Sequence, residues 1–271
     1  MANVHPDAQI GLDVTISSYV TVEDDVEIGN GTWIGPGAVI MSGTRIGQNC
    51  KIFPGAIVGS PPQDLKYNGE DTYLLIGDRV TIREYCTINK GTVSGGHITQ
   101  IGNDCLLMAY VHVAHDCIVG NGCILANNVT LAGHITIGNY ARLGGMVAVH
   151  QFVNIGDQVM IGGGTLVGKD VPPYTKCARY PATYIGINSV GLRRFKFSQE
   201  TINHILDIYR LLFVRGHIVS NALSIIETEI QATPERDKIL EFIKSSKRGI
   251  IRSPRFSSSK KSSDNEEIDN I

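Results

Sequence analysis

Residues 109–151 read AYVHVAHDCIVGNGCILANNVTLAGHITIGNYARLGGMVAVHQ, and they carry the repeat that decides the fold. An aliphatic residue recurs every six positions through this stretch, and the register continues on both sides of it. From residue 101 its members are Ile101, Leu107, Val113, Val119, Leu125, Leu131, Ile137, Leu143, Val149, Ile155, Ile161 and Val167. An earlier run from Val4 reaches Val58 and resumes at Ile76. This six-residue period is the signature of a parallel β-helix.

Three repeats close a triangular coil of 18 residues whose aliphatic positions point inward. Each coil rises by about 4.8 Å, the spacing of paired strands. No coil can bury its apolar face alone, so the coils must stack. The spacing does not fix the handedness, although parallel crossovers are normally right-handed.

Stacked coils bring residues that are 18 positions apart into one column. His115, Gly133 and Gln151 have this spacing, and each lies two positions after an aliphatic member of the repeat. We expect them on the outside of one edge of the prism. A glycine above a histidine leaves its backbone N–H open to a ligand. A histidine base with an N–H donor for a developing oxyanion suits acyl transfer. Histidines that merely decorate the surface are the alternative, which the alignment in one column disfavours.

Two interruptions of the repeat predict loops at 60–75 and 89–100. The first contains a Pro-Pro and an Asn-Gly pair, which are turn signals. Loops on rigid scaffolds often carry binding groups, so Asp64 and Lys66 are candidates for ligand contacts. A solvated charged loop is the alternative reading of the same residues. The second interruption holds a Gly-Gly pair, which indicates a flexible excursion.

The repeat ends where two prolines follow Val171, because proline cannot donate to the ladder. We expect a β-helix domain over 1–187. Its regular coils end before a linker at 174–197, which leads into the next domain. A helical domain over 188–252 follows, and then a disordered polar tail at 253–271.

The apolar period becomes helical from Ser198 onward. Ser198 or Thr201 can cap a first helix, which Gly216 ends. A second helix is expected at 218–230, and a third after Pro234. Such a bundle would cover the open end of the β-helix or pack beside it.

Composition narrows the class of protein. The 271 residues carry a formal charge of −2, which gives no sign of nucleic-acid binding. Five of the six cysteines occupy the small inward position of the repeat and read as buried free thiols, which suit a reducing compartment: Cys50, Cys86, Cys105, Cys117 and Cys123. Cys177 lies outside the repeat, where exposure is expected. The N-terminus shows no signal peptide and no apolar run reaches membrane length, so we expect a cytoplasmic protein without a transmembrane segment.

Six local motifs accompany the repeat in chain order. They are PPQDLKY (61–67), HVAHDC (112–117), LAGH (131–134), AVHQF (148–152), DVPPY (170–174) and NSVGLRR (188–194). Together they resemble the acyl-carrier-protein–UDP-N-acetylglucosamine O-acyltransferases of lipid A synthesis, over roughly residues 1–252. The resemblance implies a left-handed β-helix, an exception to the usual right-handed crossover.

The resemblance also implies an activity and a site. An (R)-3-hydroxyacyl chain would pass from acyl carrier protein to the sugar 3-hydroxyl of UDP-N-acetylglucosamine. His115 would act as general base, Asp116 would hold its imidazole, and the Gly133 N–H would donate to the oxyanion. The implied substrate contacts are Asp64, Lys66, His112, His134, His150, Gln151, Asn188 and Arg194. Neither metal nor bound cofactor is implied, because the thioester arrives on the carrier's phosphopantetheine.

Further expectations follow from the same resemblance. Gly163 and Met160 would measure acyl-chain length, and a glycine leaves room for a long chain. The family is homotrimeric, with active sites between subunits. A basic cluster would face the acidic carrier protein. It consists of Arg193, Arg194, Lys196, Arg210 and Arg215. Val190 and Pro181 depart from the acidic residue and the histidine that the family pattern has there.

Three other functions are alternatives. A zinc enzyme like the γ-class carbonic anhydrases could use His112, His115 and His134. The N-acyltransferase of the same pathway has an extra N-terminal domain, whereas the repeat here starts at Val4. A non-catalytic hexapeptide scaffold has no need of the histidine column.

Overall fold

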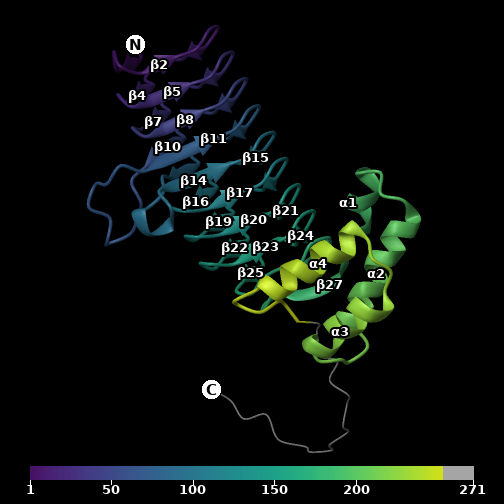
Figure 1. The fold of residues 1–271 in the computed structure, drawn as a ribbon. Coiled ribbons are helices and arrows are strands. Elements are labelled where there is room, and N and C mark those ends of the chain that lie inside the picture. The colour runs from purple at the N-terminus through teal and green to yellow at the C-terminus, as the bar shows by residue number, and fades with distance from the viewer. Residues whose placement is uncertain (253–271) are drawn as a thin grey trace, which may run out of the picture.

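The computed structural model describes residues 1–252, and its main body is a stack of triangular coils (Figure 1). Parallel strands from successive coils pair into three sheets, which form the three faces of the prism. The predicted mainly β class and the helical C-terminal region are confirmed. The tail expected at 253–271 lies outside the described residues.

Sheet A contains β1 (Asn3–Val4), β4 (Thr21–Val22), β7 (Val39–Ile40), β10 (Ile57–Ser60), β13 (Thr87–Asn89), β16 (His112–Val113), β19 (Thr130–Leu131), β22 (Ala148–Val149) and β25 (Leu166–Val167). Sheet B contains β2 (Gln9–Ile10), β5 (Val26–Ile28), β8 (Thr44–Ile46), β11 (Tyr73–Ile76), β14 (Ile98–Ile101), β17 (Ile118–Val119), β20 (Thr136–Ile137) and β23 (Asn154–Ile155). Sheet C contains β3 (Thr15–Ile16), β6 (Trp33–Ile34), β9 (Lys51–Ile52), β12 (Thr81–Ile82), β15 (Leu106–Leu107), β18 (Ile124–Leu125), β21 (Arg142–Leu143), β24 (Met160–Ile161), β26 (Thr175–Ala178) and β27 (Thr183–Ile187).

The register follows the repeat. His112 pairs with Thr130 and Thr130 with Ala148, so residues 18 apart are stacked, as the sequence predicted. The inward aliphatic residues from Ile16 onward form one continuous core along the prism axis, whereas Val4 and Ile10 of the first coil are exposed. At many corners the third residue after the inward one has a left-handed φ; Asp116, for example, has φ 61°. The sequence reading did not anticipate this conformation, which turns the chain from one face to the next.

Both interruptions lie on the same edge of the prism, between a strand of sheet A and the next strand of sheet B. They are shorter than predicted, because β11 begins at Tyr73 and β14 at Ile98. The loops are therefore 61–72 and 90–97, and they project beside β10 and β14 (Figure 1). The second is an ordered turn rather than a flexible excursion. It contains a 3-10 helix, Val93–Gly95, whose cap Thr92 accepts a hydrogen bond from the Gly95 N–H.

The prediction of a linker at 174–197 is wrong. Residues in this range form the antiparallel hairpin of β26 and β27 and a short helix, α1 (Ser189–Arg194). Cys177 lies in the hairpin and is fully buried, which corrects its expected exposure. The other cysteines are buried free thiols, as predicted. Burial raises the pKa of Cys177 to about 12, so the thiolate is disfavoured.

Three longer helices follow, close to the ranges expected. They are α2 (Gln199–Phe213), α3 (Val219–Glu229) and α4 (Pro234–Ser245). Ser198 caps α2, and Pro234 is the first residue of α4. The helices lie at the C-terminal end of the coil stack (Figure 1). The buried Tyr209 of α2 fixes this position, since its hydroxyl donates to the Pro173 carbonyl at 2.6 Å.

Candidate functional site

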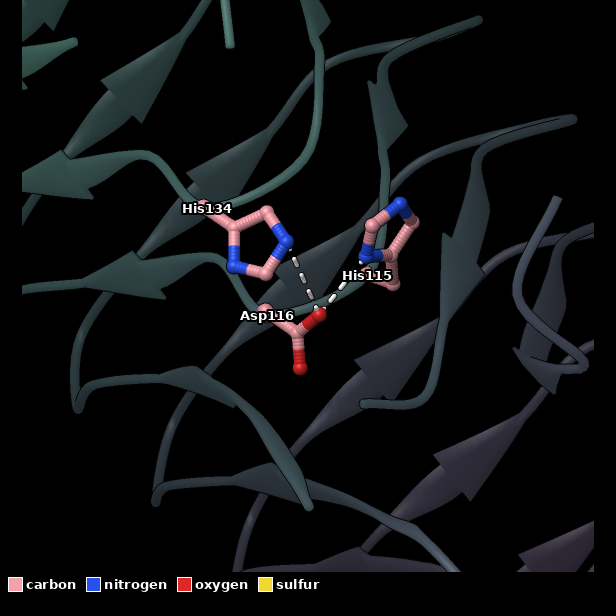
Figure 2. A group of neighbouring side chains, drawn as sticks. All are labelled: His115, Asp116 and His134. Atoms are coloured by element: carbon pink, nitrogen blue, oxygen red, sulfur yellow. Dashed lines mark hydrogen bonds and ion pairs between the residues drawn. The ribbon is translucent and has the colours of Figure 1, made fainter. Parts of the chain in front are cut away.

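His115, Asp116 and His134 meet on the edge between sheets A and B, where the chain turns after β16 and β19 (Figure 2). His115 Nδ1 lies 2.7 Å from Asp116 Oδ2, and His134 Nε2 lies 3.5 Å from the same oxygen. The Asp116 side chain is 1% exposed and that of His115 is 10% exposed. An ionised carboxylate only accepts hydrogen bonds, so Nδ1 of His115 carries its proton and Nε2 is left as the basic nitrogen.

Loop 90–97 holds the Asp116 carboxylate from the other side. The Thr92 N–H donates to Oδ1 at 2.7 Å, and the Thr92 hydroxyl donates to Oδ2 at 2.7 Å. The Asp116 N–H donates to Thr99 Oγ1 at 2.7 Å. The two hydrogen bonds from Thr92 satisfy both oxygens of a carboxylate that has almost no contact with water.

The predicted column of His115, Gly133 and Gln151 follows the register, because Val113 pairs with Leu131 and Leu131 pairs with Val149. A Cβ built on Gly133 would lie 2.6 Å from His115 Cε1 and 2.8 Å from Nε2, so the ring rests against this glycine. Within residues 1–252 the Gly133 N–H donates to no acceptor. On the edge between sheets B and C, the corresponding N–H groups of Asn103, Asn121 and Asn139 each donate to a side-chain oxygen, at 2.8 to 2.9 Å. The edge between sheets A and B therefore presents a basic nitrogen and a free N–H close together. The side chains are more enclosed than expected for the outside of the prism.

Three of the other predicted residues on this edge have partners of their own. His112 Nδ1 lies 2.7 Å from Thr87 Oγ1, and burial lowers the pKa of His112. His134 stacks on Phe152, with ring centroids 4.7 Å apart. His150 is exposed, and its Nδ1 lies 3.0 Å from the Gln151 carbonyl oxygen. Of these three, His134 lies next to His115, with ring centroids 5.1 Å apart, whereas His112 belongs to β16 on the adjoining face of sheet A.

The remaining predicted residues divide among the edges of the prism. Asp64 and Lys66 are in loop 61–72, on the same edge as His115 but in an earlier coil. The Lys66 N–H donates to Asp64 Oδ1 at 3.0 Å. Both are available for contacts beyond the loop.

Asn188 and Arg194 lie at the two ends of α1. Asn188 caps this helix, and its Nδ2 donates to the Gln158 carbonyl at 2.9 Å, on the edge between sheets B and C. The Asn188 side chain therefore holds α1 against the prism, a structural role that the sequence did not reveal. Arg194 is exposed.

Gly163 lies at the third edge, and Met160 lies on the face of sheet C just before it. Gly163 lies at the corner between β24 of sheet C and β25 of sheet A, and it is exposed. Met160 points outward from β24 and is 37% exposed. The candidate residues thus occupy all three edges of one prism.

Within residues 1–252, one group of side chains could coordinate a metal ion. The ligand atoms of His115, Asp116 and His134 all lie within 4.8 Å of one another. This group differs from the three histidines that a zinc enzyme would use, because it contains Asp116 in place of His112. The His112 ring is instead hydrogen-bonded to Thr87. The short contact between His115 and Asp116 is explained as a hydrogen bond.

Sequence reasoning missed Thr92 and Thr99. The register is broken between Ile88 and Ile101, so column arithmetic could not align either threonine with Asp116. The column of Asp116, His134 and Phe152, also spaced by 18, was open to the same arithmetic as the His115 column.

None of the helices in residues 1–252 combines the length and the apolar character that crossing a bilayer requires.

Comparison with known proteins places the chain in a family. Residues 170–251 match the family described as UDP-N-acetylglucosamine O-acyltransferase, domain 2, and residues 25–60 and 98–133 match the bacterial transferase hexapeptide repeat. The acyl-[acyl-carrier-protein]–UDP-N-acetylglucosamine O-acyltransferase of Sulfurihydrogenibium sp. is 54% identical over 256 residues, covering 92% of this chain and 94% of the relative. That of Thermodesulfovibrio yellowstonii is 47% identical, covering 93% and 97%.

Solved structures agree with these matches. The UDP-N-acetylglucosamine acyltransferase of Bacteroides fragilis is 46% identical and superposes with a TM-score of 0.91, covering 93% of this chain and 98% of its own. LpxA of Acinetobacter baumannii is 43% identical with a TM-score of 0.90, over 93% and 98%. The repeat, the helical domain and the matches over nearly the full length have one explanation: the chain belongs to the UDP-N-acetylglucosamine O-acyltransferase family.

Proposed function

We propose that this protein transfers an (R)-3-hydroxyacyl chain from acyl carrier protein to the 3-hydroxyl of UDP-N-acetylglucosamine, the first step of lipid A biosynthesis. Family membership supports the substrates, since the relatives are named for this donor and acceptor. The observation that carries the chemistry is the position of His115, whose Nδ1 is engaged by Asp116 while Nε2 lies against Gly133.

The reaction follows from those atoms. His115 Nε2 takes the proton of the sugar 3-hydroxyl, and the oxygen attacks the thioester carbonyl carbon. The Gly133 N–H donates to the oxyanion of the tetrahedral intermediate. The intermediate collapses by breaking the carbon–sulfur bond, and the imidazolium returns its proton to the phosphopantetheine thiolate. The products are the 3-O-acyl sugar nucleotide and the free carrier thiol, so no metal or resident cofactor is needed.

Substrate binding requires more than one copy of the chain. Gly163 with Met160, His115 with Asp64 and Lys66, and Asn188 with Arg194 lie toward different edges of the prism. One bound molecule can touch all of them only where edges of neighbouring copies meet. This supports a homotrimer with sites between subunits.

The other roles are proposed on the family pattern. His112, His134, His150 and Gln151 contact the sugar nucleotide around His115. Gly163 leaves the groove open for a long acyl chain. The surface that faces the acidic carrier protein consists of Arg193, Arg194, Lys196, Arg210 and Arg215. The buried free thiols support a cytoplasmic location.

The test is transfer of labelled 3-hydroxyacyl groups of several lengths from acyl carrier protein to UDP-N-acetylglucosamine. Loss of a general base should lower the rate of His115→Ala by about 10²–10⁴. His5→Ala, at an exposed histidine of the first coil, is the matched control and should keep full activity. A wild-type protein that acylates the sugar nucleotide with no chain length refutes the function, and an active His115→Ala refutes the mechanism.

A further inference from the structure

Loop 90–97 packs against the Asp116 carboxylate and shares one of its oxygens with His115. His115 approaches one oxygen of the carboxylate, and Thr92 contacts both oxygens. Thr92 is 5% exposed, so water does not compete for these hydrogen bonds. We propose that Thr92 is a positioning residue, which holds the Asp116 carboxylate in the one orientation that keeps the His115 proton on Nδ1.

The geometry explains why a second anchor is needed. Asp116 has the left-handed φ, 61°, that many corners of the prism share, so the backbone at this corner does not by itself orient the carboxylate. Its Oδ2 receives the Thr92 hydroxyl and His115 Nδ1, both at 2.7 Å. Without Thr92 the carboxylate can rotate about its terminal torsion, which is broad for aspartate. His115 would then lose the partner that selects its tautomer.

The loop is shaped for this contact. A Cβ on Gly95 would lie 2.0 to 2.4 Å from the carboxylate carbon and oxygens of Asp116. Only glycine allows the 3-10 turn to approach so closely. The turn is in addition held by the Thr92 hydroxyl, which accepts from the Gly95 N–H at 3.2 Å. A flexible surface loop has no need of a glycine at this position, whereas a loop that presses on a buried carboxylate does.

The inference rests on the proposed function for its kinetic consequences and on the structure alone for the tautomer. Thr92→Val keeps the size of the side chain and removes the hydroxyl. Thr92→Ser keeps the hydroxyl. Ser94→Ala is the matched control, because it removes a hydroxyl 3.1 Å from Thr92 Oγ1 in the same turn without changing a contact to Asp116.

In acyl transfer, Thr92→Val should lower kcat about tenfold, the usual size for a hydrogen bond to a charged group. KM for both substrates should stay within about twofold, since Thr92 does not touch them. Thr92→Ser and Ser94→Ala should stay close to wild type. In an Asp116→Ala background Thr92→Val should change kcat by less than about twofold, because the group through which it acts is gone.

A second measurement does not depend on activity. Nitrogen-15 chemical shifts of His115 in the full chain should report an Nδ1–H tautomer in wild type and Thr92→Ser, and a mixture in Thr92→Val. Equal kcat losses in both backgrounds, a raised KM with normal kcat, or an unchanged tautomer in Thr92→Val would overturn the inference. If wild type transfers no acyl group, the proposed function fails, and the tautomer still decides the role of Thr92.

Discussion

The proposed chemistry depends on the different surroundings of the two ring nitrogens of His115. Asp116 engages Nδ1 of His115, and the absence of a side chain at Gly133 leaves room for the Nε2 side of the ring. Gly133 has no left-handed φ that would exclude other residues, so the space around it is what restricts the position. The glycine thus matters for the distance between ring and backbone.

Gly133→Ala should therefore impair catalysis without unfolding the coil. The new methyl group would overlap the His115 ring and displace it, and a misplacement of about 1 Å can cost on the order of 10²-fold in rate. Gly168→Ala is the control, because a Cβ there meets nothing within 4 Å. Steady-state transfer kinetics and circular dichroism of both variants check the prediction. A fully active Gly133→Ala would show that the ring does not need this contact.

His112 should make stability depend on pH. Burial lowers its pKa below the ordinary 6.5, so on acidification the unfolded chain takes up a proton before the folded chain does. The free energy of unfolding should fall as pH drops below 6.5 and level off below the folded-state pKa. Urea unfolding at several pH values should show that the free energy of unfolding changes less steeply with pH in His112→Gln than in wild type. Identical slopes would mean that His112 is not the group responsible.

At the scale of elements, short strands are held by the corners between them. On the edge between sheets B and C, side chains of successive coils cap the backbone of the coil before. Asn121, Asn139 and Asp157 each accept an N–H from the residue 18 positions earlier, at 2.8 to 2.9 Å. Asp157 also pairs with Lys238 of α4, which ties the helical domain to the end of this ladder.

Removal of one of these side-chain acceptors should destabilise the stack of coils. Asn121→Ala leaves the Asn103 N–H without its acceptor and should lower the free energy of unfolding by about 1 kcal/mol. Asn127→Ala is matched to it, because the Asn127 side chain is exposed and makes no hydrogen bond within residues 1–252. Thermal unfolding of the two variants should separate them. Equal melting temperatures would argue that solvent replaces the lost hydrogen bond.

For the whole molecule, the decisive feature is that the candidate residues lie toward different edges of one prism. His115 is at the edge between sheets A and B, and Arg194 is at the end of α1. A triangular prism cannot bring its own edges together. The proposed homotrimer would resolve this, because a site between neighbouring copies takes the two kinds of residue from different chains.

Complementation between variants tests this arrangement. His115→Ala and Arg194→Ala should each have little activity as pure proteins. When equal amounts are unfolded and reassembled together, roughly one quarter of the sites should receive both intact residues if these come from different subunits of a closed ring. Activity should recover to that fraction of wild type. No recovery in verified mixed oligomers would place both residues of a site on one chain.

The sequence by itself determined the fold of the coils, because a six-residue period with inward aliphatic residues satisfies only a stack of triangular turns. The same period placed His115 over Gly133, since a regular stack converts sequence distance into spatial distance. Tertiary structure decided what the broken register conceals: Thr92 and Thr99 reach Asp116 from an interruption with no period to extrapolate. It also showed the hairpin where a linker was expected, because β26 and β27 are defined by pairing with β24 and with each other, and such contacts leave no local signal.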